Sequence, residues 1–117
     1  MFDFGNPEAS ARTLVESAAD NSPGLVDKPI DEMTIEELKR SLVICRMASQ
    51  MALEEGSGQS TFDIVLDWHD ELLKALLAVD KTMRKHVLSH RFPYPRKKSQ
   101  ETIDYYRKLV EDAASES

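Results

Sequence analysis

Two long stretches of helical periodicity are separated by only three residues, Gly56-Ser57-Gly58, and this spacing constrains the fold more than any other feature of the chain. Glycine tolerates the left-handed backbone that ends a helix, so Gly56 is well placed to stop the first stretch. Helices joined by so short a connection are antiparallel neighbours. The sequence therefore predicts an antiparallel helical hairpin at the centre of the fold.

The first helix of the hairpin has a complete start signal. Thr34 and Glu37 have the spacing of a capping box, and Met33 and Leu38 can form the hydrophobic staple that accompanies it. Apolar side chains then recur every three or four residues and predict one buried face. This face comprises Ile35, Leu38, Leu42, Cys45, Ser49 and Ala52, widened by Ile44, Ala48 and Met51.

The second helix is predicted to be the longest, because its periodicity continues from Ser60 or Thr61, the expected N-caps, to His90 or Arg91. A helix of about thirty residues spans about 45 Å, so its basic C-terminal third is expected to project beyond its partner. Its apolar face comprises Phe62, Val65, His69, Leu72, Leu76, Val79, Met83 and Val87, flanked by Leu66, Trp68, Leu73 and Leu77.

The two ends of the chain complete an all-α prediction. Residues 1–33 are predicted to be an extended N-terminal arm containing a short helix, which Asn6 caps and in which Leu14 and Val15 lie on a narrow apolar stripe. Residues 34–117 form the helical domain, whose C-terminal helix is capped by Ser99. Polar arms rarely order alone, so this one is expected to lie against a neighbouring subunit and to contribute little to folding.

The charge distribution gives the clearest indication of function. Residues 81–98 hold seven cations and no carboxylate, whereas the other 99 residues hold eight cations and 21 carboxylates. This basic run ends in a loop stiffened by prolines 93 and 95, which is expected to present two aromatic rings. The predicted partner-binding residues are therefore Lys81, Arg84, Lys85, Arg91, Phe92, Tyr94, Arg96, Lys97 and Lys98.

Three classes of function are compatible with this pattern. The favoured one is a non-enzymatic structural or adaptor subunit of a larger assembly, such as a virion, whose arm and basic helix end contact a protein partner or copies of itself. An alternative is a small regulator or inhibitor that binds a host or cellular protein. Another is a nucleic-acid-associated protein that uses residues 81–98, although the acidic remainder of the chain would repel a duplex.

Two histidines in the basic run are spaced as zinc ligands on a helix often are. His86 and His90 are four residues apart, but a zinc site needs a third ligand. Residues 81–98 contain no Asp, Glu or Cys, and the cations of the run oppose the binding of a metal ion. We therefore expect the two histidines to extend the basic surface, and we expect no metal site.

Carboxylates recur at helical spacing around His69, and such groups can hold a hard cation such as Mg²⁺. They are Asp63, Asp67, Asp70 and Glu71. The arrangement resembles that of the all-α nucleoside-triphosphate pyrophosphohydrolases, which use carboxylates from two facing helices; here Glu36-Glu37 or Glu54-Glu55 would face them. However, Arg40 stands where the motif Glu-Glu-x-x-Glu requires its last carboxylate. We therefore expect a solvated acidic face and no catalysis.

The apolar runs, the first residues and the single cysteine indicate where in the cell the protein is expected. No apolar run approaches the roughly 20 residues needed to cross a bilayer, and Met1–Phe4 lacks the features of a secretory signal. Cys45, the single cysteine, is expected in the core and cannot form an internal disulfide. We expect a cytoplasmic or virion protein with no cofactor and no membrane contact.

Overall fold

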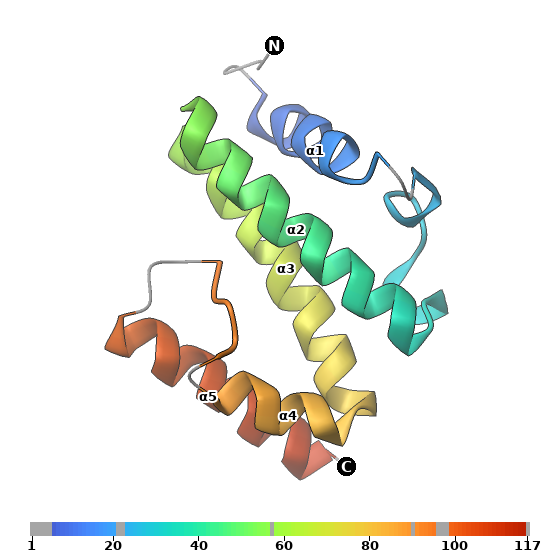
Figure 1. Ribbon diagram of the computed structural model, residues 1–117, viewed down its shortest axis with the longest axis vertical. Helices are drawn as coiled ribbons and strands as arrows, with labels where there is room; N and C mark the ends of the chain where they lie inside the picture. Colours follow the sequence, from blue (N-terminus) through green and yellow to red (C-terminus); the bar gives the residue numbers. More distant parts are fainter. Residues whose placement is uncertain (1–5, 21–22, 57, 90, 96–98, 117) are drawn as a thin grey trace.

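The computed structural model describes residues 6–20, 23–56, 58–89, 91–95 and 99–116 (Figure 1). Over these residues the fold is all-helical, as predicted, and contains no strand. In chain order the elements are α1 (Pro7–Ala18), η1 (Pro23–Leu25), η2 (Ile30–Glu32), α2 (Ile35–Glu55), α3 (Gln59–Val79), α4 (Lys81–Leu88) and α5 (Gln100–Glu116).

Helices α2 and α3 form the predicted antiparallel hairpin at the centre of the molecule (Figure 1). The capping box is present: the Thr34 hydroxyl accepts a hydrogen bond from the Glu37 N–H, and the Glu37 carboxylate accepts one from the Thr34 N–H. Gly56 ends α2 in the left-handed conformation, with φ of 64°. Gly58, and not Ser60 or Thr61, occupies the N-cap position of α3, and Thr61 is buried.

Helix α1 is the predicted short helix, and the Asn6 side chain caps it by accepting a hydrogen bond from the N–H of Ala9. Its apolar stripe lies on α2 and α3 of the same chain, not on a neighbouring subunit (Figure 1). Three of its side chains, those of Ala11, Leu14 and Val15, are buried in the core shared with the hairpin, and so is Ala19 in the turn that follows. Because these contacts lie within the chain, we expect α1 to stabilise the fold.

The prediction of one continuous helix from residue 60 to residue 90 is wrong, because the helix breaks at Asp80. This residue has an extended backbone, with φ of −123° and ψ of 99°. Its carboxylate accepts hydrogen bonds from the N–H groups of Thr82 and Met83, at 3.0 and 3.2 Å, and so caps α4. Aspartate is among the best N-cap residues because its short side chain reaches these otherwise unpaired donors.

The basic third of the predicted long helix therefore does not project, since α4 turns away from α3 and packs against α5 (Figure 1). Val87 of α4 and Phe92 of the next turn are both buried in the core. Helix α5 begins after Ser99, whose hydroxyl accepts a hydrogen bond from the N–H of Thr102, as predicted. The α4–α5 pair and α1 thus lie on opposite sides of the hairpin (Figure 1).

Candidate functional site

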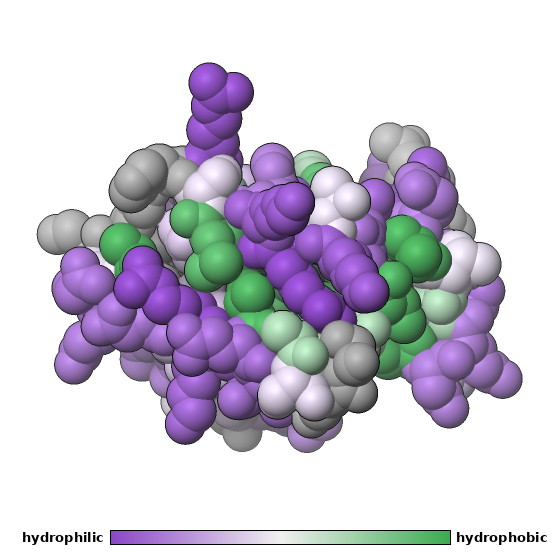
Figure 2. All heavy atoms as spheres, turned by 90° about the horizontal axis from the view of Figure 1, so that it is seen from below, coloured by the Kyte–Doolittle hydropathy of each residue, from purple (hydrophilic) through white to green (hydrophobic). Residues whose placement is uncertain are grey.

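The described cations of residues 81–98 lie on α4 and on the turn after it. Lys81, Lys85 and Arg91 are exposed, and we call these three side chains the basic surface. Figure 2 views the end of the molecule that carries α4 and shows hydrophilic side chains around small, separate apolar groups. Arg84 instead points inward, and its Nε donates a hydrogen bond of 2.8 Å to the carbonyl oxygen of Leu77. Arg96, Lys97 and Lys98, which were also predicted to bind a partner, lie outside the described residues.

The basic surface is not neutralised by carboxylates of the described residues. None of its three side chains forms an ion pair within this part of the chain. The carboxylate closest in sequence, that of Asp80, lies 3.2 Å from Nζ of Lys39 on α2. Burial raises the pKa of Asp80, but hydrogen bonds from Lys39 and from two backbone N–H groups outweigh it and hold this pKa below its ordinary value. Asp80 is thus occupied in joining α2 to α4.

Phe92 and Tyr94, the two aromatic residues predicted to contact a partner, hold the loop against the core. Phe92 is only 4% exposed, so the expectation that the loop presents its ring is wrong. Its ring lies edge-on to those of His86 and Tyr94, at centroid distances of 5.9 and 5.3 Å. Tyr94 is half-buried, its hydroxyl donates to the carbonyl oxygen of Val87, and burial raises its pKa. These contacts fix the orientation of the basic surface.

The predicted acidic face of α3 is divided between surface and interior. Asp63, Asp67 and Glu71 are exposed, as expected. Asp70 and His69, however, are 7% and 1% exposed, so the expectation that Asp70 is solvated is wrong.

The buried carboxylate of Asp70 joins α3 to α5. It accepts hydrogen bonds of 3.0 Å from the hydroxyl groups of Tyr105 and Tyr106, and its Oδ1 lies 3.8 Å from Nδ1 of His69. Two tyrosine donors offset part of the cost of removing a carboxylate from water. No periodicity of α3 alone could indicate this pairing, because the donors lie 35 and 36 residues further along the chain.

Sequence reasoning also did not anticipate a pocket of about 190 Å³ between α1, the η1–η2 segment and the hairpin. Cys45 lies in its wall, is 4% exposed as expected of a core residue, and has its pKa raised to about 12 by burial. A thiol with this pKa is almost entirely protonated at neutral pH and is a poor nucleophile. The lining is mostly apolar: Val15, Leu25, Val26, Ile30, Met33, Ile44, Cys45, Trp68 and Leu72, with Arg12, Lys28, Ser41 and Glu71.

Within the described residues, no group of three or more His, Cys, Asp or Glu side chains is arranged to hold a metal ion. His90, one member of the histidine pair, lies outside these residues. None of the described helices combines the length and the apolar character that crossing a membrane requires.

Comparison with known proteins adds no family to these observations. No protein-family model matches the chain, and neither a curated protein nor a solved structure matches it.

Proposed function

We propose that the protein is a non-enzymatic adaptor or structural subunit of a larger assembly, and that it binds an acidic protein surface through the basic surface of α4. The observation that carries this proposal is the exposure of Lys81, Lys85 and Arg91 without a carboxylate partner in the described part of the chain. Clustered cations of this kind create a local positive potential although the whole chain has a net charge of −6.

The rigid support of these cations favours a binding role. Val87 and Phe92 are buried beneath them, and Asp80 fixes the start of α4 through the backbone of Thr82 and Met83. A binding surface held in one orientation loses little conformational freedom when its partner arrives.

The interior polar residues support a non-enzymatic role. His69, Asp70 and Tyr106 lie together, but all three side chains are buried, which denies a substrate access to them. Their contacts instead join α3 to α5, as a structural element would.

Affinity capture with the immobilised full chain tests the proposal. Wild type is compared with a Lys81→Glu/Lys85→Glu/Arg91→Glu variant at low and high salt, and the retained proteins are identified by mass spectrometry. We expect acidic proteins to be retained by wild type at low salt and lost by the variant. A Lys74→Glu/Arg107→Glu/Lys108→Glu variant makes the same change in net charge at exposed positions elsewhere and is expected to retain them.

Equal retention by wild type and by the variant of the basic surface would refute the proposal. A gel-shift assay with single-stranded RNA and DNA covers the alternative class. Binding that the basic-surface variant abolishes and that weakens steeply with salt would favour a nucleic-acid-associated function instead.

A further inference from the structure

An apolar groove with an acidic edge lies on the hairpin, away from α4. Phe62 and Leu66 of α3 and the half-buried Pro95 line it, and Leu53, which is 60% exposed, stands at its edge. Exposure of so much of a leucine side chain costs free energy that contact with a partner would recover. We call the set Leu53, Phe62, Asp63, Leu66 and Asp67 the acidic groove.

The charged side chains among the described residues of this groove have one sign. Asp63 and Asp67 are exposed one turn apart on α3, and no cation is among the described residues that line the groove. Asp63 accepts a hydrogen bond from the side chain of Gln59, and Asp67 forms no ion pair with another described residue. The groove is therefore suited to a ligand that combines an apolar side chain with cations.

Helix α4 carries that combination on its outer face. Lys81, Lys85 and Leu88 are spaced i, i+4 and i+7, which places them on one side of a helix. Leu88 is 49% exposed, whereas Val87, on the inner side, is fully buried. The basic surface thus has an exposed leucine beside its cations, just as the acidic groove has one beside its carboxylates.

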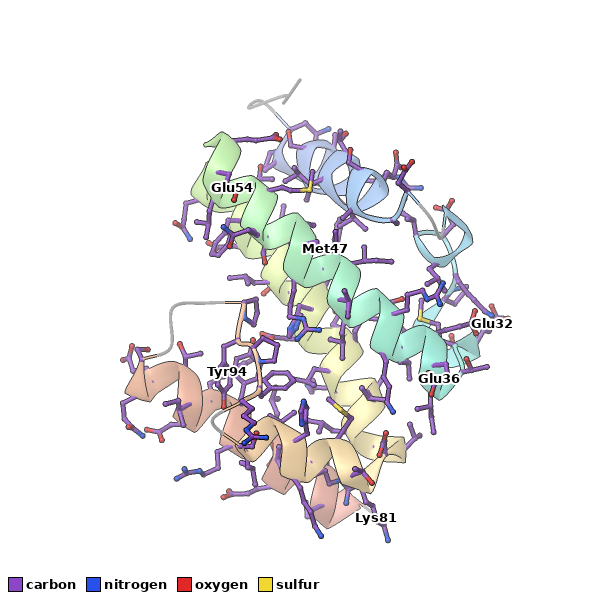
Figure 3. All side chains as sticks on the ribbon, viewed as in Figure 1. Glu32, Glu36, Met47, Glu54, Lys81 and Tyr94 are labelled. Atoms are coloured by element: carbon purple, nitrogen blue, oxygen red, sulfur yellow. The ribbon has the colours of Figure 1, made fainter. Side chains whose placement is uncertain are left out.

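These two complementary surfaces lie at different ends of the molecule. Figure 1 shows α4 at the lower end and the junction of α2 with α3 at the upper end, and Figure 3 shows Lys81 and Glu54 at these two ends. A single chain cannot bring the two surfaces together without unfolding. A second copy can supply the missing surface, and the contact is then head-to-tail, between two different patches.

We propose that α4 of one copy binds in the acidic groove of a second copy, so that the chain forms head-to-tail assemblies. Leu88 of one copy contacts Leu53 and Phe62 of the next, while Lys81 and Lys85 face Asp63 and Asp67. The inference rests on the proposed function and specifies its acidic partner as another copy of this chain.

Charge reversal and mixing test the contact. Sedimentation velocity over a series of protein concentrations measures self-association of wild type, of Lys81→Glu/Lys85→Glu and of Asp63→Lys/Asp67→Lys. We expect wild type to associate and each variant alone to associate at least about tenfold more weakly, since like charges then meet. An equimolar mixture of the two variants is expected to regain association, because opposite charges meet again at both patches.

A matched control and a rescue separate this contact from general charge effects. Two control variants change exposed residues elsewhere on the chain: Lys74→Glu/Lys108→Glu and Glu111→Lys/Asp112→Lys. Each changes the net charge by the same amount as the lysine or the aspartate variant that it matches, and each is expected to leave association unchanged. A variant with all four reversals in one chain is expected to associate as wild type does.

Several results would overturn the inference. One is a wild-type chain that stays monomeric at every concentration, and another is a mixture of the two variants that stays as weak as each alone. If the monomeric chain still captures a different acidic protein through Lys81 and Lys85, self-association is refuted and the proposed function stands. If capture is also insensitive to these lysines, both fail.

Discussion

The two sides of the α2–α3 hairpin are packed by different chemistry. On one side, α1 contributes only small and aliphatic side chains to the core, such as Ala11 and Leu14. On the other side, the turn after α4 contributes the ring of Phe92 and α5 contributes that of Tyr106, which donates a hydrogen bond to the buried Asp70. The core contacts of the first interface are apolar and depend on shape and area, whereas those of the second also include hydrogen bonds to a buried carboxylate.

This difference shows why the apolar stripe of α1 was predictable, although its packing within the chain was not, and why the burial of Asp70 was not predictable at all. An aliphatic stripe is visible as periodicity in the sequence of a single helix. In the sequence of one helix, a buried carboxylate cannot be distinguished from an exposed one. The difference lies in its hydrogen-bond donors, which are distant in the sequence. The following substitutions probe the two interfaces in order of decreasing expected effect.

The largest effect is expected on the α1 side. Leu14 is 2% exposed, so Leu14→Ala removes buried volume and is expected to cost about 2–5 kcal/mol of unfolding free energy. Removal of residues 1–30 should destabilise the chain further, contrary to the expectation from sequence that the arm contributes little to folding. Chemical denaturation measures both. A loss below about 1 kcal/mol for Leu14→Ala would mean that α1 does not share the core.

A smaller effect is expected on the opposite side. Tyr106→Phe keeps the ring and removes one donor to the Asp70 carboxylate, which is expected to cost about 1–3 kcal/mol because the acceptor remains buried. Tyr105→Phe is the matched control, since Tyr105 donates to the same carboxylate but is 42% exposed. Denaturation should therefore rank Tyr106→Phe above Tyr105→Phe, and an equal or reversed ranking would contradict the buried hydrogen bond.

The smallest effect is expected at Asp80, where α3 of the hairpin meets α4. Asp80→Asn keeps a side-chain acceptor for the α4 cap but loses the charge that pairs with Lys39. The folded-state pKa of Asp80 is lowered, so the stability that the charge contributes is present above the unfolded pKa and is lost as pH falls through the folded pKa. The stability difference between wild type and Asp80→Asn should therefore shrink below about pH 3.9, the ordinary value for aspartate. A difference that persists at lower pH would exclude the charge as its cause.

Signals confined to a few neighbouring residues predicted the boundaries of several helices. The Thr34–Glu37 capping box, Gly56 at the end of α2, and the caps of α1 and α5 by Asn6 and Ser99 all have the contacts that their residue types indicate. Each depends on atoms within one turn of helix, so no knowledge of the tertiary fold is needed.

The errors arise where a hydrophobic period conceals a local cap or where distant residues decide the structure. Asp80 lies within an unbroken helical period that conceals its role as N-cap of α4, and the Nζ of Lys39 on α2 also meets its carboxylate at the break. Phe92 lies within the basic run and resembles an exposed anchor, yet its ring packs near Tyr106 of α5. Of the predicted binding residues, Lys81, Lys85 and Arg91 are exposed as required, and their role in binding a partner stays a prediction.

The break at Asp80 has a consequence for the rate at which a partner could bind. A continuous helix would carry its cations on a free end that bends and rotates, and binding would have to select one orientation. Because α4 is capped at Asp80 and fixed at Val87, the helix that carries the cations keeps one orientation before any encounter. Long-range attraction then acts on a surface that is already aligned, and added salt should slow association far more than it speeds dissociation.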